Sequence, residues 1–253
     1  MNYIIGKKNL KKKIFMTKLS IVIPCYNEEN NVEPLFKKIE ELLNLDKDLE
    51  IIIVENGSTD NTKNNIFNSH LVHKEKIKVH KIDENIGYGH GIMSGVKVAD
   101  GEFIGWCHAD LQTEPKDVYD AYQKNLDTLK NDRIVIKGLR KNRNFFDNFF
   151  TFCMSVIASI IFFRLINDIN AQPKLFSKDF KNHLIDYPND FSLDLYFLII
   201  AKIKNYKIIN HNVVLKNRLY NEAKGGGTFK GKIKLIKRTL LYMFKLKKKI
   251  WKL

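Results

Sequence analysis

Cysteine is scarce in this 253-residue sequence, which contains only Cys25, Cys107 and Cys153. An odd number of widely spaced cysteines, with no CxxC pair, argues against a disulfide framework or a structural zinc site. The apolar runs near the N-terminus are too short for the hydrophobic region of a secretory signal, so no cleaved targeting peptide is predicted. We therefore expect the protein to work in a reducing cytoplasm.

Acidic residues are missing from both ends of the chain. Residues 1–18 carry six lysines and no acid, and residues 230–253 carry ten Lys or Arg and no acid. The net charge of +15 is therefore located at the ends, and the middle is about neutral. Because no nucleic-acid motif accompanies this charge, we predict no nucleic-acid partner. Basic ends suit an anionic membrane surface, where each cation contributes ~1 kcal/mol. Solvated lysine tails are the alternative interpretation.

The sequence also lacks an apolar run long enough to span a bilayer. The longest uncharged stretch, Asn148 to Phe163, has sixteen residues and lies in an aromatic segment from Phe145 to Ile166. A spanning helix needs roughly 20 predominantly apolar residues, so an interfacial or core helix is predicted. Apolar residues from Ile233 to Phe244 recur at helical spacing between lysines, which predicts a basic amphipathic helix.

Five apolar, β-branched runs in the first half of the chain read as strands. They cover Leu19–Pro24, Glu50–Val54, Ile77–Ile82, Glu102–Cys107 and Arg133–Lys137. Segments with helical spacing lie between them. This alternation predicts an α/β fold with a mainly parallel sheet flanked by helices. Ligands in such folds bind beyond the carboxyl ends of the strands.

Four short motifs follow these strands in order. They are Pro24-Cys25-Tyr26-Asn27-Glu28, Glu55-Asn56-Gly57-Ser58-Thr59-Asp60, Asn85-Ile86-Gly87 and Ala109-Asp110-Leu111-Gln112. Taken singly, their acids and hydroxyls also suit helix N-termini. As an ordered set, they resemble family 2 glycosyltransferases, and in pattern the polyprenyl-phosphate sugar synthases. The similarity covers roughly residues 18–225.

The resemblance implies a GT-A fold, Rossmann-like in its nucleotide-sugar-binding part, and transfer with inversion at the anomeric carbon. It also implies which residues bind the nucleotide-sugar. These are Pro24, Tyr26, Glu28, Glu55, Asn56, Gly57, Ser58, Asn85, Gly87, Ala109, Asp110, Gln112 and Lys224.

The fourth motif departs from the family pattern, which normally has Asp-x-Asp. Here the first position is His108, while Asp110 matches the metal-binding aspartate and Gln112 lies beside it. These three residues are the predicted ligands of a divalent cation, Mn²⁺ or Mg²⁺. Imidazole suits manganese better than magnesium, which favours Mn²⁺. Alternatively, His108 only hydrogen-bonds a phosphate or the sugar.

Later segments resemble the acceptor side of the family's site. Arg140 and Arg143 follow the fifth predicted strand. Asp168 lies in a segment that resembles the family's acceptor-side loop but differs from its usual sequence. These three residues are therefore predicted to bind the acceptor. Asp110, Asp194 and Arg218 are the predicted catalytic residues, with Asp194 as base for a hydroxyl acceptor and Arg218 countering leaving-group charge.

The predicted organisation is a basic N-terminal arm over residues 1–17, a GT-A domain over 18–228 that includes an acceptor and membrane-interface segment at about 144–166, and a basic amphipathic helix over 229–253. The predicted activity is sugar transfer from a nucleotide-sugar to a membrane-presented acceptor. Polyprenyl phosphate is the preferred acceptor, and a lipid-linked glycan is the second choice. The protein is expected to be peripheral, on the cytoplasmic face of the membrane. Two alternatives stay open: a hydroxyl-acceptor transferase in cell-surface polysaccharide synthesis, and a non-catalytic nucleotide-sugar binding module.

Overall fold

The structure is a computed structural model that describes residues 18–131, 133–142, 145–220 and 229–250. The predicted basic arm over residues 1–17 lies outside the described residues. The strands are β1 (Leu19–Cys25), β2 (Leu49–Asn56), β3 (Ile77–Ile82), β4 (Phe103–Trp106), β5 (Ile134–Lys141), β6 (Lys174–Ser177) and β7 (Lys207–Val214). The α-helices are α1 (Val32–Leu45), α2 (Thr62–Phe67), α3 (Tyr88–Val98), α4 (Pro115–Lys124), α5 (Leu126–Asn131), α6 (Phe145–Phe162), α7 (Lys178–Lys181), α8 (Leu193–Ile203) and α9 (Phe229–Ile250), with a 3₁₀ turn over His70–His73.

One seven-stranded sheet with the order β3-β2-β1-β4-β6-β5-β7 organises the chain. β6 pairs antiparallel with both β4 and β5, and the other pairings are parallel. The predicted α/β fold with a mainly parallel sheet is confirmed. β6 and β7 were absent from the prediction because β6 has only four residues, and β7 is a largely exposed edge strand without an apolar run.

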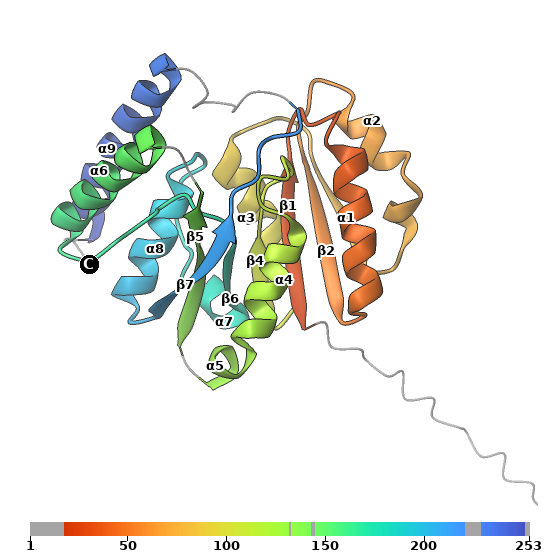
Figure 1. The fold of residues 1–253 in the computed structure, drawn as a ribbon, viewed down its shortest axis with the longest axis horizontal. Coiled ribbons are helices and arrows are strands. Elements are labelled where there is room, and N and C mark those ends of the chain that lie inside the picture. Colours follow the sequence, from red (N-terminus) through yellow and green to blue (C-terminus); the bar gives the residue numbers. More distant parts are fainter. Residues whose placement is uncertain (1–17, 132, 143–144, 221–228, 251–253) are drawn as a thin grey trace, which may run out of the picture.

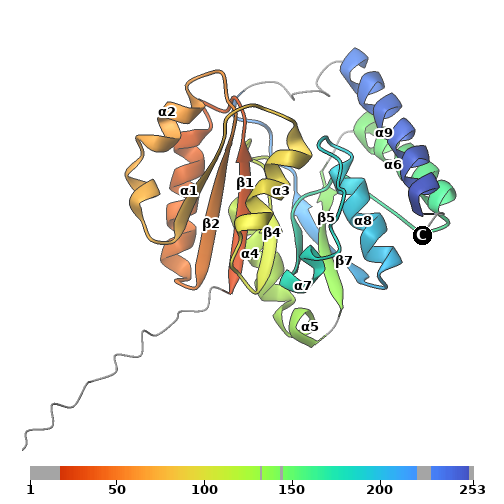
Figure 2. The same cartoon turned by 180° about the vertical axis from the view of Figure 1, so that it is seen from behind.

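Both faces of the sheet are buried, which follows from the continuous apolar runs in its strands. Ile21 and Ile51 point into the core beneath α1, α2 and α4, whereas Val22 and Ile52 point into the core beneath α3 and α8. Figure 1 shows α1 and α4 in front of the sheet, and Figure 2 shows α3 on the reverse face. The period-2 alternation thus builds two cores from one set of strands.

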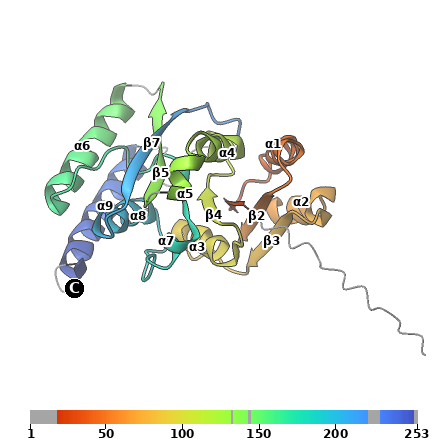
Figure 3. The same cartoon turned by 90° about the horizontal axis from the view of Figure 1, so that it is seen from below.

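α6 and α9 form a separate layer beside the β5–β7 end of the sheet, far from α1 and α2 (Figure 3). Ala158 and Ile161 of α6 and Met243 and Leu246 of α9 are buried in the core that α8 also joins. In the part of the chain that the structure describes, no helix combines the length and apolarity needed to cross a membrane.

Candidate active site

A cavity of about 340 Å³ lies where the carboxyl ends of β1, β2 and β4 meet. This is the edge where parallel sheets bind ligands. The motifs reach it because each one directly follows a strand or opens a helix. The lining residues are Pro24, Tyr26, Glu28, Asn56, Asn85, Ile86, Gly87, Tyr88, His108, Ala109, Asp110, Asp190, Phe191, Arg218 and Arg238.

The wall formed by the second and third motifs is held by two asparagine side chains. Asn85 Nδ2 donates to the Asn56 carbonyl at 3.0 Å, and Asn56 Nδ2 donates to the Gly87 carbonyl at 3.3 Å. Gly57 sits between the motifs with φ of +68°, and a Cβ there would collide with the backbone nitrogen of Asn85. The glycine is therefore required both by the left-handed backbone and by the close approach of the two loops.

Three of the predicted donor-binding residues lie behind this wall. Glu55 is buried, and its Oε1 accepts a hydrogen bond from the Ser58 backbone N–H at 2.7 Å. Neither of these residues, nor Gly57, lines the cavity. As the structure places them, Glu55 and Ser58 stabilise the turn that carries Asn56. Glu28, by contrast, lines the cavity while its carboxylate accepts from Asn31 Nδ2 at 2.6 Å.

Asp110 and Arg218 form an ion pair on the floor of the cavity. Arg218 Nη2 lies 2.7 Å from Asp110 Oδ2, and Arg218 Nε donates to Gln112 Oε1 at 3.0 Å. Gln112 Nε2 also donates to the Lys216 carbonyl at 3.3 Å, which fixes the segment that carries Arg218. Gln112 thus orients the Arg218 side chain by a hydrogen bond but does not itself line the cavity.

His108 belongs to a second polar cluster, centred on the hydroxyl of Tyr88. This hydroxyl lies 2.9 Å from His108 Nε2, donates to Asp194 Oδ2 at 3.1 Å, and accepts from Gln172 Nε2 at 3.0 Å. Burial, followed by the charge of Asp194, raises the pKa of Tyr88 well above its usual range. Tyr88 therefore stays a phenol at physiological pH.

Asp194 is 1% exposed at the first turn of α8 and does not line the cavity. Its Oδ1 lies 3.0 Å from Lys174 Nζ and accepts from Gln172 Nε2 at 2.9 Å. Burial lowers the pKa of Lys174, and the neighbouring Asp194 opposes this shift. The carboxylate is thus held between a buried lysine and the Tyr88 hydroxyl.

The predicted acceptor-side residues lie apart from this cavity. Asp168 accepts from the Arg140 backbone N–H and from Arg140 Nε, both at 2.9 Å, and neither residue lines the cavity. Burial acts to raise the pKa of Asp168, but the hydrogen bonds and charge of Arg140 outweigh it, so this pKa is lowered. Arg143 and Lys224, the remaining predicted binding residues, lie outside the described residues.

The sequence interpretation missed several residues of the cavity. Phe191 stacks on Tyr88 with ring centroids 4.6 Å apart, and Arg238 lies over Phe191 while its Nε is 3.1 Å from Asp190 Oδ2. Tyr88 follows the Asn85-Ile86-Gly87 motif directly, so its position was available in the sequence. Arg238 was assigned only to the basic helix, because nothing in the local pattern places α9 beside the cavity.

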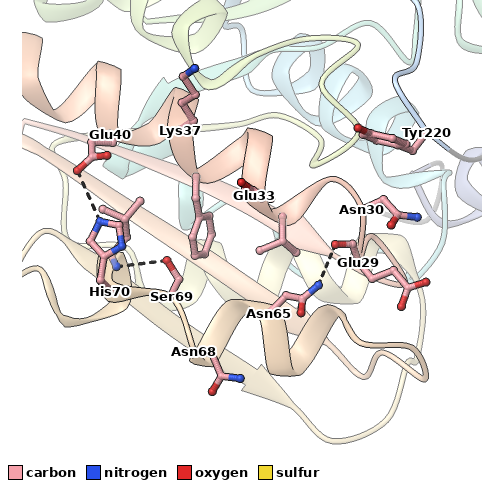
Figure 4. A pocket seen from close by; sticks show the side chains of 13 residues that line it. Glu29, Asn30, Glu33, Lys37, Glu40, Asn65, Asn68, Ser69, His70 and Tyr220 are labelled. Atoms are coloured by element: carbon pink, nitrogen blue, oxygen red, sulfur yellow. Dashed lines mark hydrogen bonds and ion pairs between the residues drawn. The ribbon is translucent and has the colours of Figure 1, made fainter.

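A larger hollow of about 750 Å³ lies between α1 and α2 (Figure 4). Its rim carries Glu29, Glu33, Glu40 and His70, and Val32 and Phe36 also line it. His70 Nε2 lies 3.8 Å from Glu40 Oε1. This hollow contains none of the strand-end residues that converge on the smaller cavity, so we place the candidate active site at the latter.

Comparison with known proteins identifies the family and the fold. The model of the family described as Glycosyl transferase family 2 matches residues 20–175, which is more than half of the chain. The chain is 25% identical over 172 residues to an undecaprenyl-phosphate 4-deoxy-4-formamido-L-arabinose transferase of Proteus mirabilis, covering 68% of this chain and 51% of the relative. It is 32% identical over 128 residues to a dodecaprenyl-phosphate galacturonate synthase of Rhizobium johnstonii, covering 49% and 36%. The chain thus spans about half or less of the length of these curated relatives.

Solved structures share the fold at lower identity. A glucosyl-3-phosphoglycerate synthase from Mycobacterium tuberculosis, in complex with Mn²⁺, UDP and glucosyl-3-phosphoglycerate, superposes with a TM-score of 0.66 at 16% identity, covering 91% of this chain and 80% of that one. A mannosyltransferase from Pyrobaculum calidifontis, in complex with GDP-Man and Mn²⁺, gives 0.58 at 19% identity, covering 81% and 57%. These neighbours confirm the predicted GT-A type of fold. The family match over residues 20–175 shows that the chain belongs to glycosyl transferase family 2.

Proposed function

We propose that this glycosyltransferase moves a sugar from a nucleotide-sugar to a polyprenyl phosphate presented at the cytoplasmic face of a membrane. The observation that carries the proposal is the Asp110–Arg218 pair on the floor of a cavity lined by the family's motif residues. A carboxylate for a cation and a guanidinium for a diphosphate are the two groups that nucleotide departure needs. The names of the two curated relatives, both acting on polyprenyl phosphates, support the acceptor class.

The cavity has groups suited to a nucleotide-sugar. Tyr26 offers an aromatic side chain for a base, and Asn56 and Asn85 offer amides for ribose or base edges. Gly87 precedes α3, where the backbone N–H groups of Gly89 and His90 already donate to the Asn189 carbonyl. The guanidinium groups of Arg218 and Arg238 are therefore the groups of this lining that suit phosphate oxygens. We assign the nucleotide to this wall and the diphosphate to the region between α3 and Asp110.

The same cavity fits a divalent cation shared with substrate. Among the residues that the structure describes, no group of three or more His, Cys, Asp or Glu side chains forms a metal site by itself. Asp110 and His108 nevertheless both line the cavity, and Mg²⁺ sites commonly combine one or two carboxylates with substrate phosphates. When bound, a cation there would offset the charge of the departing diphosphate. Asp110 and His108 would hold it, and the nitrogen ligand favours Mn²⁺.

In the proposed reaction, an oxygen of the acceptor phosphate attacks C1 of the donor sugar from the face opposite the leaving group. The C1–O bond to the diphosphate breaks, and the nucleoside diphosphate departs with the bonding electron pair, which inverts C1. Arg218 turns from Asp110 to the diphosphate and stabilises the charge that develops. A phosphate acceptor is already anionic, so no general base is required.

The α6–α9 layer supplies a surface for the membrane. Phe145, Phe146, Phe149 and Phe152 of α6 are all at least half exposed, as are Ile233, Leu241 and Phe244 of α9. Lysines accompany them, and Lys247 lies 4.9 Å from the ring centroid of Phe163. Exposed aromatic side chains beside basic residues are typical of helices that lie in a membrane interface. We propose that this layer binds the anionic bilayer and that the protein is peripheral.

One observation weakens the hydroxyl-acceptor alternative. The carboxylate of Asp194, its predicted base, is buried and accepts hydrogen bonds from Tyr88 and Gln172 while it pairs with Lys174. A general base must reach the acceptor hydroxyl directly or through one water. We therefore give Asp194 a positioning role and keep the phosphate acceptor as the conclusion.

The decisive experiment measures nucleotide release from a panel of nucleotide-sugars, with Mn²⁺, Mg²⁺ or chelator, and with polyprenyl phosphate or a glycan as acceptor. We expect metal-dependent turnover with polyprenyl phosphate that Asp110→Asn lowers by about 10²-fold or more. Asp120→Asn, which removes an exposed surface ion pair with Lys116 on α4, is the matched control. Turnover with the glycan alone would replace the acceptor assignment, and donor binding without turnover would favour a non-catalytic module.

A further inference from the structure

The hydrogen bonds around Tyr88 determine which nitrogen of His108 carries a proton. Asp194 accepts from three donors, namely the Tyr88 hydroxyl, Gln172 Nε2 and Lys174 Nζ. A carboxylate in this role has no proton to give. The single proton of the Tyr88 hydroxyl therefore points to Asp194 Oδ2.

The orientation of Gln172 is fixed by the same carboxylate. Its Nε2 donates both to Asp194 Oδ1 at 2.9 Å and to the Tyr88 oxygen at 3.0 Å, which uses both amide protons. Reversing the amide would place its oxygen against the carboxylate. The present orientation holds even though Gln172 Oε1 is buried without a described partner. The Tyr88 oxygen is thus an acceptor toward Gln172.

His108 approaches the same oxygen, with Nε2 at 2.9 Å. Because the phenol proton is already given to Asp194, the contact is a hydrogen bond only if Nε2 bears the proton and donates. Nδ1 is then the ring nitrogen that remains, and no group in the described ranges hydrogen-bonds it. His108 lines the cavity together with Asp110, two residues further along the chain.

We propose that Tyr88 fixes His108 with its proton on Nε2, so that the lone pair of Nδ1 and the Asp110 carboxylate bind one Mn²⁺ ion. This inference rests on the proposed function and adds the residues that prepare the ligand. Metal-binding histidines usually donate their second ring N–H to an outer partner, which fixes the tautomer and the ring orientation. Here the outer partner is a phenol that is itself held by Asp194, Gln172 and, one step further, the buried Lys174.

This arrangement also accounts for the departure from Asp-x-Asp. An aspartate at position 108 would bind a cation without any choice of tautomer. A histidine binds it only when the ring nitrogen that faces the cation is unprotonated. Tyr88, Gln172 and Asp194 are positioning residues in this scheme, since they act on the metal through His108. A mixed nitrogen and oxygen donor set selects Mn²⁺ over Mg²⁺.

The test reads the tautomer and the metal directly, without turnover. In ¹⁵N NMR spectra of the full chain at pH 8, His108 should show a protonated Nε2 and an unprotonated Nδ1, and Mn²⁺ should broaden the Nδ1 signal selectively. Tyr88→Phe keeps the ring stacked on Phe191 but removes the hydroxyl. We expect it to mix the two tautomers and weaken Mn²⁺ binding by about 10-fold or more, measured by the EPR signal of free Mn²⁺ with and without UDP or GDP.

Tyr196→Phe is the matched control, because that buried hydroxyl donates to the Ile185 carbonyl and not to the cluster. It should leave both readouts unchanged. A protonated Nδ1 in the wild type, no Mn²⁺ binding, or equal Mn²⁺ affinity in Tyr88→Phe would overturn the inference. Turnover that persists in any of these cases would leave the proposed sugar transfer standing. A fixed tautomer and Mn²⁺ binding without turnover on any acceptor would keep this inference and overturn the proposed transfer.

Discussion

Arg218 forms an ion pair with Asp110, the carboxylate proposed to bind the cation, and Nη2 lies 2.7 Å from Oδ2. Arginine and cation therefore compete for Asp110 until the diphosphate arrives and offers Arg218 another anion. We predict that Arg218→Gln binds Mn²⁺ more tightly than the wild type in the absence of nucleotide but turns over about 10²-fold more slowly. EPR titration and nucleotide release measure the two effects.

The control for this prediction is Arg133→Gln, which removes an arginine that lies over Tyr206 before the start of β5, whereas Asp110 follows the carboxyl end of β4. It should change neither Mn²⁺ affinity nor turnover. Unchanged Mn²⁺ affinity in Arg218→Gln would show that the ion pair does not compete with the cation.

The aromatic face of α6 should govern membrane binding. Replacing Phe149 and Phe152 by serine removes two side chains that are 52% and 65% exposed. Each buried aromatic ring contributes about 1.5–3 kcal/mol, so we expect binding to vesicles with anionic lipid to fall by tenfold or more in a sedimentation assay. Leu45→Ser, a similar change at the end of α1, should have no effect. Equal losses in both variants would remove α6 from the interface.

Gly57→Ala tests the junction between the second and third motifs. The added methyl group meets the Asn85 backbone, and the position has a positive φ. We expect a loss of about 1–3 kcal/mol in the free energy of unfolding, measured by urea denaturation, together with weaker donor binding. The exposed substitution Lys63→Ala on the adjacent α2 should stay near the wild type. A wild-type stability for Gly57→Ala would contradict the close approach of the two loops.

Lys137 should make stability depend on pH. Burial lowers its pKa from 10.5 to about 7, so between these values the unfolded chain binds more protons than the folded one. The free energy of unfolding therefore rises with pH in this window, by at most about 1.4 kcal/mol per pH unit for one group. Urea denaturation at pH 7.0 and 8.5 should show the rise. The Cys107 thiol, whose pKa is raised by burial, acts with the opposite sign as the pH approaches its ordinary value of 9.0, so it offsets only a small part of the rise at pH 8.5.

Lys137→Met should flatten this dependence by about 1–2 kcal/mol over the interval. It also removes the hydrogen bond from Lys137 Nζ to the Gly138 carbonyl at 3.0 Å, which lowers stability equally at both pH values. A slope that survives in Lys137→Met would assign the effect to another group, with the buried Lys174 as the next to replace.

The central strands could be predicted from the sequence because they depend on local patterns, whereas the site residues were predicted from the family resemblance. Continuous apolar runs identify β1 and β2, and Pro24, Tyr26 and Asn56 at their carboxyl ends line the cavity. The partners of Asp194 could not be predicted. Gln172 and Lys174 lie just before and at the start of β6, whereas Tyr88 opens α3 and Asp194 lies in the first turn of α8, and tertiary packing brings these three segments together. Arg238 reaches the cavity through packing of α9, which no local spacing encodes.

The reversed strand β6 has an evolutionary consequence. β5 and β6 are neighbours in the sheet, yet the segment between them leaves the sheet, forms α6 and returns. The donor-facing strands β1, β2 and β4 are already paired without it. Such an excursion can be lengthened, shortened or exchanged while the nucleotide half of the enzyme keeps its geometry. Chimeras that swap residues 145–167 among relatives, while keeping Asp168 and Gln172, therefore test whether this segment selects the acceptor without changing the donor specificity.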